Sequence, residues 1–326
     1  MNQRMDMDFL VAISGETAVA PSATPAQPTV PATCVKTSGV SPGSYWADMD
    51  IVEYHTRAPG VSSSRLKHIL VSPAHYQIKL SRPMLETDAL RIGRMLHTTV
   101  LEPHLLASEF AIWTQGRRQG QEWEIFKLLN QDRTIITNDQ RECVEGMSEA
   151  MYQIDDFPFE GWLHGVGHIP AAVKERSIFW IDEETGLECR ARPDAMTLGE
   201  SPLAGDVKST RSADPDQFVR DIFNMRYDLQ AAHYVAGIKA VFGVDAKFVF
   251  FAAEKEAPHV ARSFLMSPDS LAHGERYRRY CLRMIKKCTD EGIWPKQPVG
   301  AKAILVEPPF MKDKDLLDLA AAYGLR

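Results

Sequence analysis

The chain has 326 residues and a formal net charge of −6, and 44% of its residues are hydrophobic and 25% charged. These values are ordinary for a globular protein with a full core, built as one large domain or two small ones. No apolar run reaches the roughly 18 residues of a membrane span, and the acidic N-terminus is unlike a secretory signal. We therefore expect a cytoplasmic protein without a membrane partner.

The cysteines exclude several metal and redox classes. There are five, an odd number, and no two of them form a CxxC pair: Cys34, Cys143, Cys189, Cys281 and Cys288. This pattern argues against a disulfide framework, a zinc ribbon and a four-thiolate iron–sulfur cluster. The chain also lacks a GxxxxGK[ST] loop, so we expect no ATP motor.

The first 45 residues differ in composition from the rest of the chain. Ala, Pro, Thr, Ser and Val dominate residues 15–44, with prolines at regular intervals. Such a segment cannot bury enough side chain to offset the entropy lost on ordering. We predict that residues 1–45 form a disordered tail, with a partner-docking arm as the alternative, and that residues 46–326 form the folded domain.

The first predicted helix follows a run of three serines. Ser62, Ser63 and Ser64 offer an N-cap for a helix that includes Lys67 and ends before Ser72. The hydroxyls and free N–H groups at such a helix start also suit a DNA phosphate. Helix capping and phosphate binding both remain open, because the same residues can serve both.

A second predicted helix covers residues 87–106 and contains His97. A single helical histidine is more often a packed or surface residue than a ligand, so its pattern alone assigns no role. Gly93, one turn earlier, would let another element approach closely. Residues 115–121 read as a polar loop in which Arg117 and Arg118 are either solvated or in contact with DNA.

Further helices are predicted at residues 121–130 and 138–153, followed by irregular chain at 157–169. Residues 173–182 and 187–194 are rich in β-branched and aromatic residues, and the turn between them ends in Gly186. This pattern predicts a β-hairpin. Asp194 shares the polar alternation of Arg190 and Arg192 along the second run.

The strongest chemical signal lies in residues 205–210. Alternate side chains of a strand share a face, so Asp206 and Lys208 point the same way while Val207 is buried behind them. If Asp194 lies on a neighbouring strand, its carboxylate and that of Asp206 repel each other, and a hard divalent cation such as Mg²⁺ relieves that repulsion. Lys208 would then hold or help deprotonate an attacking water.

The next helix is predicted to begin at Asp214-Pro215 and to end at Gly243, with Gln230 and Tyr234 on one face. These two side chains would orient a phosphate or water, or else pack in the core. Strands are predicted at residues 246–253 and 259–266. The long helix at 268–291 carries an apolar stripe and a basic stripe, the latter either solvated or tracking phosphates. Residues 289–324 read as Pro-rich irregular chain with a short terminal helix.

Several of these motifs together resemble the PD-(D/E)XK nuclease superfamily, and within it the RecE-type exonucleases (exodeoxyribonuclease VIII) of phages and prophages. The resemblance rests on Glu175, Arg192-Pro193-Asp194, residues 206–210 and Gln230-Ala-Ala-His-Tyr234, and upstream on residues 61–66, 72–76 and 93–103. It implies an α/β, restriction-endonuclease-like core with a central mixed β-sheet flanked by helices. It also implies Mg²⁺, with Mn²⁺ as a substitute, and digestion of linear duplex DNA from its ends in the cytoplasm of the bacterial host.

The resemblance also assigns roles to individual residues. His97, Asp194, Asp206 and the Val207 carbonyl would bind metal. The Glu175 carboxylate would either bind a second metal or lie next to the ligands of the first. Lys208 would act on the attacking water, and Gln230 and Tyr234 would position that water or the phosphate. The DNA contacts would be Ser62, Ser63, Ser64, Lys67, Arg192 and Thr210.

The resemblance further implies 5′→3′ digestion that leaves 3′ single strands for a RecT-like annealing protein. The acidic net charge makes tight DNA binding by a monomer doubtful. The resemblance also implies a ring of subunits that encloses the duplex, so we expect a homo-oligomer, a tetramer rather than a trimer. The alternatives are a RecB-like or structure-specific endonuclease, and a non-catalytic DNA-binding module on the same fold.

Overall fold

The computed structural model describes residues 44–49, 51–81, 87–155, 163, 172–198 and 202–297. Residues 1–43 of the tail predicted at 1–45, the chain at 157–162 and 164–169, and the segment from 298 onward lie outside these residues. The first strand, β1 (Tyr45–Ala47), begins within one residue of the predicted domain start. No helix in the described ranges has the length and apolar character needed to cross a membrane.

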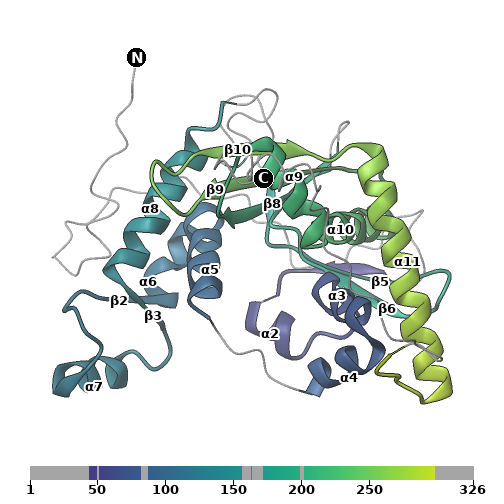
Figure 1. Cartoon of the computed structure of the whole chain (residues 1–326), viewed down its shortest axis with the longest axis horizontal. Coiled ribbons are helices and arrows are strands. Elements are labelled where there is room, and N and C mark those ends of the chain that lie inside the picture. Colours follow the sequence, from purple (N-terminus) through teal and green to yellow (C-terminus); the bar gives the residue numbers. More distant parts are fainter. Residues whose placement is uncertain are drawn as a thin grey trace, which may run out of the picture.

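A five-stranded mixed sheet forms the centre of the molecule (Figure 1). Its strands are β4 (Val173–Lys174), β7 (Ala195–Thr197), β8 (Leu203–Thr210), β9 (Lys247–Glu254) and β10 (Ala261–Leu265), in the order β10-β9-β8-β7-β4. The pair β8–β9 is parallel and the other pairs are antiparallel. This sheet with its flanking helices confirms the predicted α/β fold.

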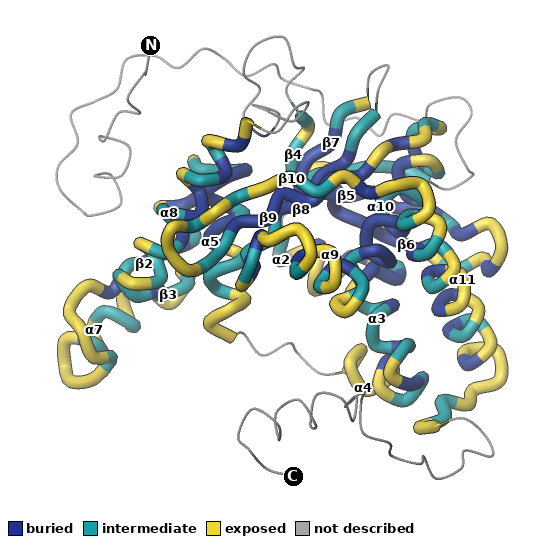
Figure 2. The backbone as a smooth tube through the Cα atoms, turned by 45° about the horizontal axis from the view of Figure 1, so that its top comes forward, coloured by how far each residue is buried: buried dark blue, intermediate teal, exposed yellow. Residues whose placement is uncertain are grey.

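Strand β9 explains how the sheet is covered on both faces. Phe248 and Phe250 point into one hydrophobic cluster, whereas Val249 and Phe251 point into another. The first cluster includes α9 (Pro215–Asn224), α10 (Tyr227–Phe242) and α11 (Pro268–Glu291), and the second includes α5 (Asp88–Leu101) and α8 (Asn138–Tyr152). A strand buried on both faces needs no polar alternation, which accounts for its continuous apolar sequence. Figure 2 shows the resulting buried centre.

The predicted hairpin is present but belongs to a different sheet. Strands β5 (Ser177–Ile181) and β6 (Glu188–Ala191) pair antiparallel around a turn in which Gly186 has φ +69°. Together with β1 they form a separate three-stranded sheet. The prediction that Asp194 continues the alternation of Arg190 is wrong, because β6 ends at Ala191 and the chain then enters β7 of the central sheet.

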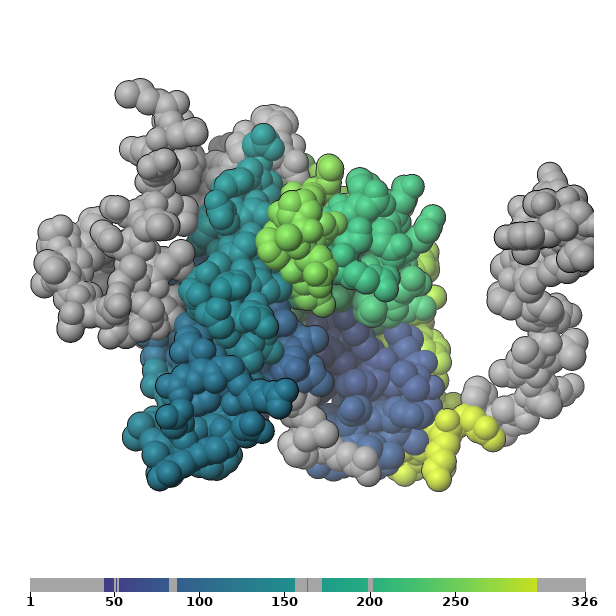
Figure 3. Space-filling view, turned by 60° about the vertical axis from the view of Figure 1, so that its left-hand side comes forward, coloured from purple at the N-terminus to yellow at the C-terminus, as the bar shows by residue number. Residues whose placement is uncertain are grey.

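The helix predictions near the N-terminus are confirmed by α3 (Ser63–Val71), which ends before Pro73, and by α5, whose N-cap is Thr87. The predicted helix from Asp214 to Gly243 is two helices, because Arg226 adopts a left-handed conformation (φ 56°) between α9 and α10. On the face shown in Figure 3, the blue surface of residues 60–80 lies below the green surface of residues 211–224.

The sequence analysis missed two short parallel strands, β2 (Phe110–Trp113) and β3 (Thr134–Thr137). The helix between them, α7 (Gly120–Leu129), follows the predicted polar loop and projects from the body (Figure 1). The remaining helices are α2 (Ile51–Thr56), α4 (Pro73–Ser81), the 3₁₀ turn η1 (Pro103–Leu105) and α6 (Leu106–Glu109).

Candidate active site

Strand β8 places Asp206 and Lys208 on the same face, as predicted. Asp206 is 2% exposed, and its Oδ2 forms an ion pair with the Lys208 ammonium. Its Oδ1 accepts a hydrogen bond of 2.6 Å from Gln230 Nε2. Val207, between them, is fully buried in the cluster that contains α5 and α8. Both oxygens of this buried carboxylate therefore have a fixed partner.

Helix α10 brings three polar side chains to this face of β8. Gln230 Nε2 lies 3.2 Å from the Tyr234 hydroxyl, so the two residues predicted from their helical spacing are in contact. One turn earlier, the Tyr227 ring centroid lies 5.0 Å from Lys208 Nζ. The sequence analysis missed Tyr227, although its spacing of three residues from Gln230 would have placed it on the same helical face.

A second group of polar side chains lies beside the β8 backbone, at the Val207 peptide group. His97, Glu175 and Asp194 each offer one ligand atom, and these atoms lie within 4.8 Å of one another. His97 Nε2 is 2.9 Å from the Val207 carbonyl oxygen, and its Nδ1 is 3.4 Å from Asp194 Oδ2. Asp194 Oδ2 in turn accepts a 2.6 Å hydrogen bond from the Val207 N–H. The Val207 peptide group thus links this cluster to the strand that carries Asp206 and Lys208.

Glu175 reaches the cluster through an unusual backbone conformation. It follows β4 with φ 53°, in the left-handed region that non-glycine residues rarely adopt. Its N–H donates to the Asp194 carbonyl (3.0 Å), and its carboxylate accepts a 2.6 Å hydrogen bond from Arg192 Nε. Strained residues held by their surroundings are found preferentially at functional sites.

The three clustered groups are poorly suited to carrying charge without a counter-ion. Burial and the nearby Asp206 carboxylate raise the pKa of Asp194 well above its usual value. Burial and the Asp194 carboxylate raise the pKa of Glu175 to about 7, and burial lowers the pKa of His97. Two crowded carboxylates, a neutral imidazole and an adjacent backbone carbonyl are a donor set that fits a hard divalent cation.

Lys208 has the opposite electrostatic surroundings. Burial alone would lower its pKa, but the Asp206 and Asp194 carboxylates raise the pKa above its usual value. Lys208 is therefore a fixed positive charge at neutral pH. This favours a role in holding a water molecule or a negatively charged oxygen over one in removing a proton.

The residues predicted to contact DNA fall into two groups: those on α3, and Arg192 and Thr210, whose side chains already form hydrogen bonds within the protein. Ser62 is the N-cap of α3, yet its side chain makes no capping hydrogen bond and lies 3.0 Å from the Ser64 hydroxyl. By contrast, Arg192 is 9% exposed and Thr210 is 7% exposed. Arg192 donates to Glu175 and to the Met49 carbonyl (2.5 Å), which gives it a positioning role in place of a surface contact. The Thr210 hydroxyl donates to the Ser212 carbonyl (3.0 Å).

The basic stripe of α11 is largely neutralised. Arg279 and Arg283 form ion pairs with Glu184, and Lys286 pairs with Asp290 (2.6 Å). These pairs favour the solvated alternative for this stripe. In the loop before α7, Arg118 donates to the Ile135 carbonyl (3.4 Å).

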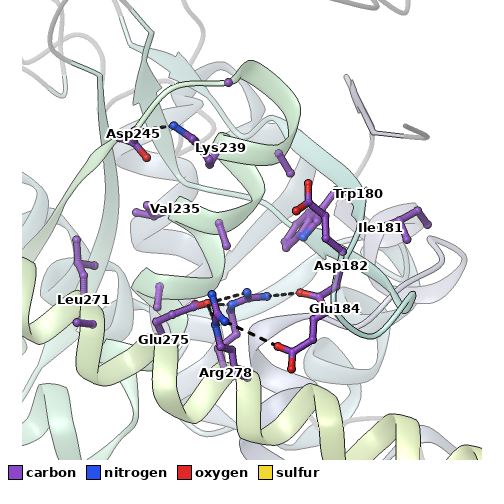
Figure 4. Close-up of a pocket in the computed structure, with 17 residues that line it drawn as sticks. Trp180, Ile181, Asp182, Glu184, Val235, Lys239, Asp245, Leu271, Glu275 and Arg278 are labelled. Carbon is purple, nitrogen blue, oxygen red and sulfur yellow. Dashed lines mark hydrogen bonds and ion pairs between the residues drawn. The ribbon is translucent and has the colours of Figure 1, made fainter. Parts of the chain in front are cut away.

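A cavity of about 790 Å³ lies on the far side of α10, away from this site (Figure 4). Its walls come from the end of β5, the outer face of α10 and the first half of α11, and it includes none of the site residues named above. Its central guanidinium, Arg278, is already paired with Asp182 (3.0 Å) and Glu275 (2.6 Å). We therefore assign the chemistry to the β8 site.

Comparison with known proteins identifies the fold and the family of the chain. No curated protein matches the chain. A crystal structure from Eubacterium rectale, described as a "putative exonuclease", matches with a TM-score of 0.54 and 14% sequence identity. The match covers 82% of this chain and 98% of that chain, and at this identity it shows a common fold. Residues 62–304 match the model of a PDDEXK-like domain of unknown function (DUF3799), so the chain belongs to this PDDEXK-like family.

Proposed function

We propose that this protein is a Mg²⁺-dependent exodeoxyribonuclease that digests linear double-stranded DNA from its ends. One observation carries the proposal: the Asp206–Lys208 pair on β8 lies beside the His97, Glu175 and Asp194 cluster, and the Val207 peptide group joins the two. The family match and the fold shared with a protein described as an exonuclease support the same chemistry.

The residues that would hold the metal are Asp194, Asp206, His97 and the Val207 carbonyl, with Glu175 beside them. A bound Mg²⁺, for which Mn²⁺ would substitute, supplies Lewis-acid stabilisation of a phosphate oxygen. Lys208 contributes a fixed positive charge next to the Asp206 carboxylate. Its ammonium would hold the attacking water and offset the charge that develops on the phosphate.

The α10 side chains would keep these groups in position. Gln230 fixes the Asp206 carboxylate through a 2.6 Å hydrogen bond and contacts the Tyr234 hydroxyl. Burial and the Asp206 carboxylate raise the pKa of Tyr234 well above its usual value, so the phenol stays protonated. It therefore remains a hydrogen-bond donor for a water or phosphate oxygen.

The direction of digestion and the partners belong to the same proposal. Digestion in the 5′→3′ direction would leave 3′ single strands for an annealing protein in homologous recombination, as the resemblance to RecE-type enzymes implies. The rival functions are a RecB-like or structure-specific endonuclease and a non-catalytic DNA-binding module.

End-labelled linear duplex and closed circular DNA separate these functions. The proposal expects release of label from linear ends in Mg²⁺, an intact circle, and no release in EDTA. Nicking of the circle would favour the endonuclease. Binding to DNA without any cleavage in excess Mg²⁺ or Mn²⁺ would favour the non-catalytic module.

A further inference from the structure

Two lysines lie against one aromatic ring beside the candidate active site. The Tyr227 ring centroid is 5.0 Å from Lys208 Nζ and 4.8 Å from Lys67 Nζ. The two ammonium groups come from different elements, β8 and α3, and α3 packs against α10, which carries the ring. Two positive charges placed this close repel each other unless negative charge is added.

The two ammonium groups differ in how their charge is compensated. Lys208 forms an ion pair with Asp206. Across the described residues Lys67 forms no ion pair, although it is partly buried, and its contact with the ring gives partial compensation. Burial and the Lys208 charge lower the pKa of Lys67 to about 8, although the Asp206 and Asp228 carboxylates oppose this shift. An unpaired and poorly hydrated cation is costly, so this position favours a bound anion.

The surrounding turn of α3 suits a phosphate. Ser63 lies one turn before Lys67 and on the same face of the helix. The side chain of Ser62 leaves the first N–H groups of α3 uncapped. These N–H groups and the Lys67 ammonium are complementary to the negatively charged oxygens of a DNA backbone phosphate.

We propose that Lys67 binds a backbone phosphate of the DNA strand beside Lys208 and thereby positions that strand for cleavage. This inference rests on the proposed nuclease function. Asp206 already neutralises Lys208, so the phosphate at Lys67 is a second one, distinct from the phosphate that is cut. Tyr227 keeps the two cations at a fixed spacing.

The first test compares Lys67→Met with Lys79→Met. Lys79 is an exposed lysine on α4, the helix that follows α3. Lys79→Met therefore removes the same positive charge from the protein as Lys67→Met, but outside the candidate active site. DNA affinity is measured in Ca²⁺ with linear duplex, and single-turnover cleavage in Mg²⁺. We expect Lys67→Met to lower both by about 10- to 100-fold relative to Lys79→Met, and Lys67→Arg to recover part of each. Equal behaviour of the two Met variants would overturn the proposal.

The second test locates the contact. A duplex carries a single neutral methylphosphonate at one of the first several linkages from its end. At one linkage the modification should weaken binding by the wild-type protein but not by Lys67→Met, because both changes remove the same interaction. Additive effects at every linkage would overturn the proposal, and would show that Lys67 acts through packing alone.

The binding measurements also separate this inference from the proposed function. If the wild-type protein binds DNA but cuts none, the nuclease proposal fails, whereas a methylphosphonate-specific loss with Lys67→Met still supports the phosphate contact. If the wild-type protein cuts DNA and Lys67→Met matches Lys79→Met, the nuclease proposal stands and the role of Lys67 is refuted. Thermal unfolding of each variant identifies any that fail to fold, and Lys67→Gln, which also removes the charge, then replaces Lys67→Met in both tests.

Discussion

At the residue scale, the site separates groups that keep their charge from groups that need a counter-ion. Burial beside negative charge raises the pKa values of Asp194 and Glu175, whereas the adjacent carboxylates, Asp206 foremost, raise the pKa of Lys208. A cation bound at this cluster would lower the pKa values of the two acids. The charge state of the site is therefore coupled to metal binding.

The first prediction separates chemistry from binding. Asp206→Ala and Lys208→Ala should each lower single-turnover cleavage by at least about 10²–10⁴-fold, while DNA affinity is kept or, for Asp206→Ala, increased. The reason is that Asp206→Ala removes a negative charge beside the phosphates. Lys208→Arg should recover little, because its planar guanidinium differs in shape. Near-native cleavage by Lys208→Ala would refute the assignment of this site.

The second prediction concerns pH and metal-free stability. The pKa of Glu175 is raised to about 7 in the folded chain, so its contribution to stability is present below its ordinary pKa and is lost as the pH rises through 7. In EDTA, the melting temperature should therefore fall between about pH 4.5 and pH 7.5. Mg²⁺ should raise the melting temperature most at the upper end of this pH range.

Glu175→Gln is the matched control for this titration, since it keeps the shape of the side chain and removes the ionisable proton. In this variant the pH slope should be smaller than in the wild-type protein. Calorimetry in EDTA and in Mg²⁺ measures how the melting temperature depends on pH and on the metal. If Glu175→Gln has the same pH slope as the wild-type protein, another group is responsible for it.

At the element scale, the segment before α3 holds in place the arginine that binds Glu175. Arg192, which holds Glu175, also donates to the Met49 carbonyl (2.5 Å), and the Arg190 guanidinium contacts the Ala58 carbonyl and the Tyr54 ring. Strand β1 pairs with β5 in the same sheet. The described residues of this segment therefore help to position Glu175 through Arg192.

The third prediction uses two truncations. Removing residues 1–43 should leave cleavage nearly unchanged, because a segment of this composition cannot contribute to a core. Removing residues 1–58 takes away Tyr54, Met49 and β1, and should lower both cleavage and the melting temperature. Cleavage rates and thermal unfolding of both proteins test this. Loss of activity in a folded Δ1–43 protein would assign the tail a catalytic or assembly role.

The fourth prediction concerns the crossing of α10 and α11. A Cβ added at Gly274 would lie 2.0 Å from the Asp228 carbonyl oxygen, whereas one added at Gly93 meets nothing within 4 Å. Gly274→Ala should therefore force α11 away from α10 and destabilise the fold by at least about 1–3 kcal/mol. Gly93→Ala should unfold at the wild-type temperature. If Gly274→Ala is as stable as the wild-type protein, α10 and α11 do not cross as closely as described.

These elements also show what the sequence can predict. The alternation of Asp206, Val207 and Lys208 is local, and so is the spacing of Gln230 and Tyr234, so both were predicted correctly. The change of sheet between Ala191 and Ala195 and the positive φ of Glu175 depend on tertiary contacts that no local pattern encodes. The same holds for the pairing of Lys67 with Tyr227, because α3 and α10 lie far apart in the sequence.

At the scale of the whole molecule, the net charge of −6 opposes the binding of a polyanion. The α11 stripe gives little help, because Arg283 and Lys286 are paired with acids on the same surface. Near the site, Lys67 on α3 forms no ion pair with any residue that the structure describes. One turn of α3 provides few phosphate contacts, and DNA affinity rises with the number of phosphates neutralised. Several copies around one duplex would multiply these contacts.

The fifth prediction is therefore that the protein is a homo-oligomer, a tetramer rather than a trimer. Light scattering at micromolar concentration, with and without a short duplex, should give a mass close to four times that of the chain. The salt dependence of DNA affinity provides a second measure, because each phosphate neutralised steepens the slope by about 0.9. For a tetramer, DNA affinity should fall more steeply with salt than the phosphate contacts of one α3 turn can explain. Lys67→Met should make this slope shallower by one contact for each subunit that binds the duplex. A monomer at all concentrations, with a slope of only one or two contacts, would refute the oligomer.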